Sequence, residues 1–113
     1  MDSRPSLGLA AALSLALAVP ASAHVLSADE ARQQAEDVAS FVAGVLTADY
    51  RVKDYGVRSC EQRSEHKVVC TGYWKLVDRG DRSRWSCTAN LIVRLVDDDF
   101  DLDYNRLRCR RRR

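Results

Sequence analysis

Six arginines gather at the carboxyl end of the chain and form the clearest candidate for binding chemistry. They are Arg106, Arg108, Arg110, Arg111, Arg112 and Arg113. Guanidinium groups bind phosphate and sulfate groups through charge and paired hydrogen bonds, which makes this cluster a candidate polyanion-binding site. The formal net charge is +2, and subtracting the last four arginines leaves −2, so the excess positive charge is concentrated at this end.

The pattern of residues around these arginines narrows the class of partner. No aromatic side chain alternates with the arginines of residues 106–113, so specific nucleic-acid recognition is not expected. An anionic polymer, a lipid or an acidic protein at a cell surface is the expected partner. Two alternatives remain, a solvated terminus without a partner and neutralisation by nearby carboxylates. These carboxylates belong to Asp97, Asp98, Asp99, Asp101 and Asp103.

The two histidines, His24 and His66, are the candidate metal ligands. If cleavage follows Ala23, the amine and the imidazole of His24 become the mature amino terminus and can chelate copper, which favours nitrogen ligands. His66 is then the second ligand of a histidine brace. The alternative is that His66 is a solvated turn residue, which leaves the protein without a cofactor.

Two further groups of polar residues could have a role in function. Arg79-Gly80-Asp81 is expected at a hairpin tip, where integrin-binding loops present this tripeptide, although a tight exposed turn uses the same residues. Asp101 and Asp103 are expected on a solvent-facing strand without a pocket. His66 is the only candidate base for a serine nucleophile, so we do not expect an enzyme.

The amino-terminal residues 1–23 resemble a secretory signal peptide. Residues 7–19 are apolar, and the small residues Ala21 and Ala23 occupy the two positions that a signal peptidase recognises. The apolar run is too short for a membrane span, and none is expected after processing. The mature protein is therefore expected to be secreted, or to be periplasmic or extracellular.

Four cysteines, Cys60, Cys70, Cys87 and Cys109, are expected to form disulfides that stabilise this small domain. Four cysteines allow three connectivities, and a zinc site is the alternative, although no Cys-x-x-Cys pair is present. Cys60 and Cys70 flank a short turn and can lie opposite each other. Cys87 faces Cys109 only if one extra residue, a bulge, is inserted near Asn105 and Arg106. We therefore predict the pairs Cys60–Cys70 and Cys87–Cys109.

The hydrophobic pattern predicts one amphipathic helix followed by four antiparallel strands. A capping box of Ser27 and Glu30 starts a helix over residues 27–48. Its apolar stripe is Ala31, Ala35, Val38, Val42 and Val45, widened by Ala39 and Leu46, with Phe41 at the margin. Alternation then predicts strands over residues 50–60, with a bulge at Gly56, and over 68–77, 84–96 and 100–109.

In this register the apolar residues of the last strand share a buried face. Phe100 faces Leu95, Leu102 faces Val93 and Tyr104 faces Leu91. Trp74 and Trp85 are expected to pack together on the same face. The predicted fold is α+β: residues 24–109 form one domain in which the helix packs on a four-stranded meander, and residues 110–113 form a basic tail.

This order of elements, with two disulfides closing neighbouring hairpins in the carboxyl half, resembles the cystatin-like fold. The resemblance implies a cysteine-protease inhibitor, but the inhibitory Gln-x-Val-x-Gly hairpin is replaced by Tyr55-Gly56-Val57-Arg58-Ser59, and no Pro-Trp pair occurs in a later loop. The outline also resembles many small exported bacterial proteins. Three functions are thus open: a disulfide-stabilised binding or structural module that contacts polyanions, a protease inhibitor, and a copper-binding protein.

Overall fold

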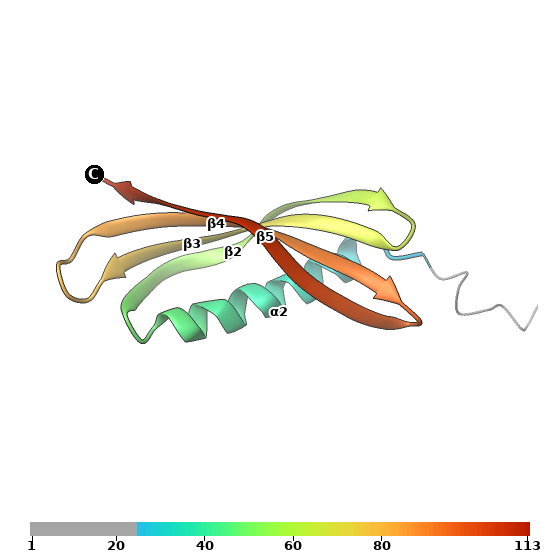
Figure 1. Ribbon diagram of the computed structural model, residues 1–113, viewed down its shortest axis with the longest axis horizontal. Coiled ribbons are helices and arrows are strands. Elements are labelled where there is room, and N and C mark those ends of the chain that lie inside the picture. The colour runs from blue at the N-terminus through green and yellow to red at the C-terminus, as the bar shows by residue number, and fades with distance from the viewer. Residues whose placement is uncertain (1–24) are drawn as a thin grey trace, which may run out of the picture.

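The computed structural model describes residues 25–113, which form a helix and a four-stranded sheet (Figure 1). Helix α2 (Ala28–Leu46) is followed by β2 (Tyr50–Ser64), β3 (Lys67–Asp78), β4 (Arg84–Val96) and β5 (Asp99–Arg112). The strands lie in the order β2-β3-β4-β5, and each pairs with its neighbours in antiparallel orientation. The predicted α+β meander is confirmed. The predicted signal peptide and His24 lie outside the described residues.

The start of α2 forms through local hydrogen bonds that the sequence predicts. The Ser27 hydroxyl accepts a bond from the Glu30 amide (3.1 Å), and a Glu30 carboxylate oxygen accepts one from the Ser27 amide (3.1 Å). Leu26, fully buried, precedes this box; its amide donates to the Glu65 carbonyl, and its own carbonyl accepts from Nε2 of the Gln62 side chain. The helix start is therefore attached to the β2–β3 turn. Among the described residues, no helix has the length and apolar character to cross a membrane.

Both predicted disulfides are present, Cys60–Cys70 between β2 and β3 and Cys87–Cys109 between β4 and β5. The β4–β5 register shifts between Thr88 and Asn90, where Thr88 pairs with Arg108 and Asn90 pairs with Asn105. This shift is the predicted bulge. Arg106 lies within it and has a φ of 54°, a left-handed conformation that residues other than glycine rarely adopt.

Strand β2 differs from the prediction in length and in the position of its irregularities. It extends to Ser64, and its register with β3 shifts at three places, next to Lys53, Arg58 and Arg63. The bulge predicted at Gly56 is wrong, because Gly56 pairs regularly with Tyr73. A Cβ atom at Gly56 would lie 3.2 Å from the Tyr73 hydroxyl, so the glycine makes room for this ring.

The core lies between α2 and the sheet, and the buried residues of the sheet belong to β3 and β4. Helix α2 contributes the buried residues Ala31, Ala35, Ala39 and Ala43, and these small side chains allow close approach to the sheet. Trp74 fills the centre, is 2 % exposed, and donates a hydrogen bond from Nε1 to the Ala39 carbonyl (3.0 Å). A Cβ atom at Gly72 would lie 2.9 Å from the Trp74 ring, so this glycine is required by the packing.

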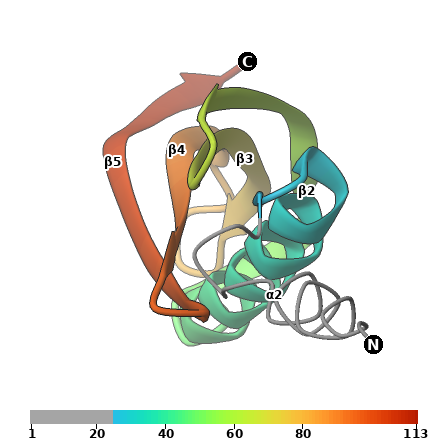
Figure 2. The ribbon, with the colours of Figure 1, turned by 90° about the vertical axis from the view of Figure 1, so that its right-hand side faces the viewer.

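The predicted burial of the last strand is wrong, although its predicted register is confirmed. Phe100, Leu102 and Tyr104 face Leu95, Val93 and Leu91 as expected. Their side chains are nevertheless exposed, by 38 %, 40 % and 60 %. Figure 2 shows the reason: α2 lies toward the β2 side of the sheet, and β5 lies at the far side. For the same reason, Val45 and Phe41 of the helix are exposed.

Candidate functional site

Strand β5 has two faces of different chemistry, which we call outer, away from α2, and inner, toward it. Every residue of β5 is exposed. Arg108, Arg110 and Arg112 pair with Thr88, Ser86 and Arg84, which belong to the outer face of β4. Residues two apart on a strand are separated by about 6.6 Å, so these arginines form a row at that spacing. We call Arg108, Arg110 and Arg112 the outer arginine row.

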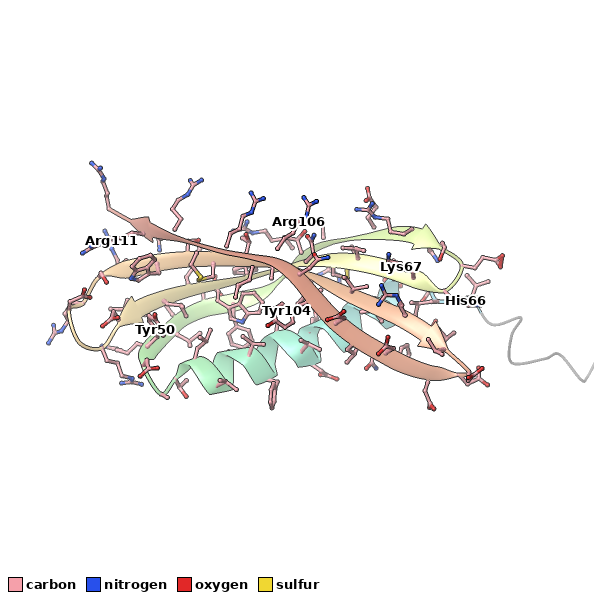
Figure 3. The ribbon with its side chains drawn as sticks, in the orientation of Figure 1. Tyr50, His66, Lys67, Tyr104, Arg106 and Arg111 are labelled. Carbon is pink, nitrogen blue, oxygen red and sulfur yellow. A yellow bond between two sulfur atoms is a disulfide. The ribbon has the colours of Figure 1, made fainter. Side chains whose placement is uncertain are left out.

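Arg106 extends this row toward two polar hollows on the outer face. One, of about 220 Å³, is lined by Thr71, Thr88, Ala89, Asn90, Arg106 and Arg108. The other, of about 540 Å³, is lined by Arg63, Lys67, Val69, Asn90, Ile92, Asn105 and Arg106. Asn90 and Arg106 line both hollows. In Figure 3, Arg106 points away from the helix, whereas Tyr104 lies on the helix side of β5.

Three basic residues that were not predicted from the sequence are neighbours of these arginines: Arg63, Lys67 and Arg84. Arg63 and Lys67 line the larger hollow with Arg106, and Arg84 pairs with Arg112. They lie on three different strands. Because they are far from residues 106–113 in the sequence, their proximity to these arginines is not apparent from the sequence alone. Carrying the register across the whole outer face would have identified Lys67 and Arg84, because both lie on strands whose alternation is clear.

The remaining two arginines of the predicted cluster lie elsewhere. Arg111 pairs with Trp85, and its charge acts on Asp81 of the β3–β4 loop. Arg113 follows the last strand, and its carbonyl accepts a hydrogen bond from the Arg84 guanidinium (2.7 Å). The structure therefore separates the six arginines into the outer row with Arg106, and two residues with other neighbours. Because β5 reaches Arg112, the predicted tail is mostly strand.

Three aspartates share the outer face of β5 with the arginine row but occupy its other half. Asp99, Asp101 and Asp103 pair with Val96, Arg94 and Ile92. Asp101 makes a long, exposed ion pair with Arg94 (3.9 Å), an interaction that contributes little to stability. The outer edge of the sheet is thus acidic along one half of β5 and basic along the other.

The Arg79-Gly80-Asp81 tripeptide forms part of the turn between β3 and β4. The amides of Gly80 and Asp81 both donate to the Asp78 carboxylate, and Arg79 Nε donates to the Thr47 carbonyl (3.1 Å). The Asp81 carboxylate accepts bonds from the hydroxyl and the amide of Ser83, and these bonds lower the pKa of Asp81. All three residues therefore have structural partners within the turn and its surroundings.

His66 lies in the turn between β2 and β3, where its backbone joins two segments. Its amide donates to the Ser64 hydroxyl (3.4 Å), and its carbonyl accepts from the Leu95 amide (2.9 Å). In the part of the chain that the structure describes, no three metal-binding side chains form a group. Because His24 lies outside that part, the copper hypothesis remains a prediction.

An apolar groove runs along the inner side of β5, between this strand and α2. It consists of two adjoining hollows of about 190 and 240 Å³ that share Val42, Leu46, Trp74 and Leu107. Leu107 is 56 % exposed at the β5 side, and Phe41 is 73 % exposed at the helix side. Trp85 lines one of the hollows, so both tryptophans lie along this groove, with Trp74 in its floor.

Comparison with known proteins adds no assignment to these surfaces. No protein-family model, curated protein or solved structure matches the chain. The segment 55–59, which replaces the inhibitory hairpin of the cystatins, lies within β2. The protease-inhibitor hypothesis remains a prediction.

Proposed function

We propose that this protein is a secreted, disulfide-stabilised binding module that holds a linear anionic polymer along the outer face of β5. The observation that supports this most is the outer arginine row, three arginines whose backbone positions repeat about every 6.6 Å on a strand that is exposed throughout. Polymers with repeated sulfate or phosphate groups offer anions in a comparable line. Arginine binds such groups by paired hydrogen bonds as well as by charge.

The two polar hollows extend the proposed path beyond the row. From Arg108 the path continues past Arg106 to Lys67 and Arg63, which also line the larger hollow; Arg63 forms an exposed ion pair with Glu61 (2.8 Å). The hydroxyls of Thr71 and Thr88 offer neutral hydrogen bonds along it, as do the polar atoms of Asn90 and Asn105 that remain beside the bond from Asn90 Nδ2 to Asn105 Oδ1 (3.0 Å). Such groups suit the hydroxyl groups of a polysaccharide, and they place the partner in the class of sulfated or phosphorylated glycans.

The shape of the sheet favours a linear polymer over a membrane. The strands twist strongly along their length, so the side chains of β5 turn about the long axis of the molecule (Figure 1). A flexible chain can follow such a twisted line, whereas a planar layer of lipid headgroups meets only part of it. The disulfides support a location outside the reducing cytoplasm. Such glycans are exposed outside the cytoplasm.

Heparin binding tests the proposal directly. We expect the oxidised protein to bind heparin, and the double variant R108Q/R110Q to raise the dissociation constant about tenfold or more, because two charge-assisted contacts are lost. The variant should also show a weaker dependence of binding on salt, because fewer counterions are released. Calorimetry and elution from a heparin column at increasing salt measure both effects.

The matched control is R51Q/K53Q, which removes the same charge from exposed positions on β2, the other edge of the sheet. It should bind heparin nearly as well as the parent protein. Equal losses in the two variants would contradict the proposal, because binding would then depend only on net charge. Tighter binding to vesicles of anionic phospholipid than to heparin would replace the polymer with a membrane surface.

A further inference from the structure

Strand β5 is an open edge of the sheet. It is the last strand, so the backbone N–H and C=O groups on its far side have no neighbouring strand within the described residues. Such an edge can pair with another chain unless short length, charge or a covering element prevents it. At fourteen residues β5 is long, and all of it is exposed. Its charges therefore decide which partner it accepts.

The bulge gives β5 a symmetry that its sequence does not show. Arg106 and Leu107 both lie opposite Ala89, so residues after the bulge have changed face relative to a regular strand. The outer face then reads Asp99, Asp101 and Asp103, next the neutral Asn105, and after the bulge Arg108, Arg110 and Arg112. The inner face reads Phe100, Leu102, Tyr104, followed by Leu107, Cys109, Arg111. Each half of the outer face is the charge complement of the other.

We propose that two copies of this chain pair through β5 as an antiparallel, two-fold symmetric dimer with one continuous sheet. Centred between Asn105 and Arg106, this pairing places Asp103 opposite Arg108 of the second copy. Asp101 then meets Arg110, and Asp99 meets Arg112. The two-fold axis repeats all three pairs. Opposite charges that face each other across strands stabilise a pairing, and like charges weaken it.

The same register matches the inner face. Tyr104 lies opposite Leu107 of the second copy, Leu102 opposite Cys109, and Phe100 opposite Arg111, whose guanidinium can stack on the ring. Tyr104 and Leu107 are more than half exposed in the single chain, so this contact removes apolar surface from water. Both helices lie on the same side of the joined sheet, and two apolar grooves meet at its centre.

Other registers fit less well. A shift by one residue places outer residues against inner ones, because successive side chains of a strand point to opposite faces. A shift by two residues keeps the faces but leaves one aspartate or arginine at each end without a partner. An alignment in which the arginine-containing half of β5 faces the same half of the second copy would place like charges opposite each other. The charge pattern therefore selects one alignment of one partner, a second copy.

The dimer goes beyond the proposed function and uses the same arginines. In the dimer the outer arginine row faces aspartates, and in the single chain it is open to a polymer. Binding of the second copy and of the polymer is therefore competitive. We expect heparin to dissociate the dimer, because a highly charged polymer offers more anions than three carboxylates.

Two charge-reversed variants test the pairing. The acid-reversed variant is D99R/D101R/D103R, and the base-reversed variant is R108D/R110D/R112D; all six positions are exposed. Sedimentation equilibrium on the oxidised protein, purified from an exporting host, should show a dimer for the parent. Each variant alone sets like charges at every outer pair and should raise the dimer dissociation constant about 100-fold or more.

The mixture of the two variants is the decisive sample. At the six changed or matching positions, an acid-reversed β5 carries only arginines and a base-reversed β5 only aspartates. All the opposite-charge pairs between these positions are therefore restored in the heterodimer. The control D37R/D54R reverses charges at exposed positions on α2 and β2 and should dimerise like the parent. Circular dichroism and disulfide mapping confirm that each variant is folded.

Three results would overturn the dimer: a parent protein that stays monomeric at about 1 mM in low salt, reversed variants that dimerise alone, or a mixture that does not associate. Hydrogen exchange of the parent gives a readout independent of any variant, since β5 amides should gain protection as protein concentration rises. The acid-reversed variant separates the two proposals, because it should lose the dimer and keep heparin binding. Loss of heparin binding in that variant would contradict the proposed polymer-binding site and leave the proposed dimer unaffected.

Discussion

Strands β2 and β5 form the two edges of one sheet, and each is joined to its inner neighbour by one disulfide, yet their surroundings differ. The helix lies over β2, where Arg32 donates hydrogen bonds to the carbonyls of Val57 and Arg58 (3.0 and 3.2 Å). Strand β5 is held by its hydrogen bonds to β4 and by the Cys87–Cys109 disulfide, and it forms one side of the apolar groove. The β2 edge is therefore attached to the helix, with partly buried residues packed against the core, and the β5 edge is available for partners.

This difference has a simple origin in the width of the two layers. A helix is about 10 Å in diameter and covers about two strands spaced 4.8 Å apart. The attachment of Leu26 and Arg32 to the β2 side decides which two strands are covered. The inner face of β5 then keeps its apolar residues in contact with solvent.

Removal of the disulfides is expected to have the largest effect and to separate the two edges. Replacing either cysteine pair by serines should lower the free energy of unfolding by about 3 kcal/mol, from the loop entropy of the unfolded chain. The local consequence should differ. Without Cys87–Cys109, amides of β5 should exchange rapidly in the native protein, because α2 lies toward the β2 side of the sheet. Without Cys60–Cys70, β2 should stay protected.

Hydrogen exchange followed by mass spectrometry measures this local difference, and urea unfolding measures the global one. The two double-serine variants serve as controls for each other. Equal protection of β2 and β5 in both variants would show that the helix does not distinguish the edges.

The two tryptophans provide a second comparison with an intermediate effect. Trp74→Phe should lower the free energy of unfolding by about 2 kcal/mol, since it removes a buried hydrogen bond to Ala39 and leaves a cavity. Trp85→Phe should cost less than about 1 kcal/mol, because Trp85 is partly exposed and its Nε1 bonds the Ser83 hydroxyl near the turn. Thermal unfolding of both variants checks the order, and a larger loss at Trp85 would place the main core nearer to β5.

The smallest expected effect concerns individual polar interactions made by two arginines, Arg32 on the helix and Arg94 on β4. Arg32→Met keeps the apolar stem and removes both bonds to β2, so we expect a loss of about 1 kcal/mol. Arg94→Met removes the long pair with Asp101 and should change stability by less than about 0.5 kcal/mol. Chemical denaturation resolves this difference. Equal values would mean that the helix is held on β2 by apolar contacts alone.

Much of the fold follows from local patterns. The capping box of Ser27 and Glu30 is correct because it involves bonds only three residues apart. The pairing of Cys87 with Cys109 is correct because side chains alternate along strands, so a cysteine on the wrong face requires a bulge. The incorrect bulge at Gly56 has the opposite origin. Glycine allows unusual backbone angles, but here it makes room for a ring on the neighbouring strand.

The residue types of the candidate site were predictable from the sequence, but their arrangement on the surface was not. Six arginines were visible at the end of the chain, but their separation into an outer row, the bulge residue Arg106 and two others depends on the register with β4. Arg63 and Lys67 join Arg106 only because three strands lie side by side. No pattern within residues 106–113 contains that information.

The sequence by itself determined the order and approximate position of the helix and the strands, the register of the last hairpin and how the cysteines pair, because periodicity and capping act over a few residues. Only the tertiary structure decided which faces of these elements are buried. The position of α2 over β2 and β3 is a contact between distant segments, and it leaves the inner face of β5 exposed. The outer arginine row and the charge symmetry of β5 likewise depend on one bulge set by its pairing with β4.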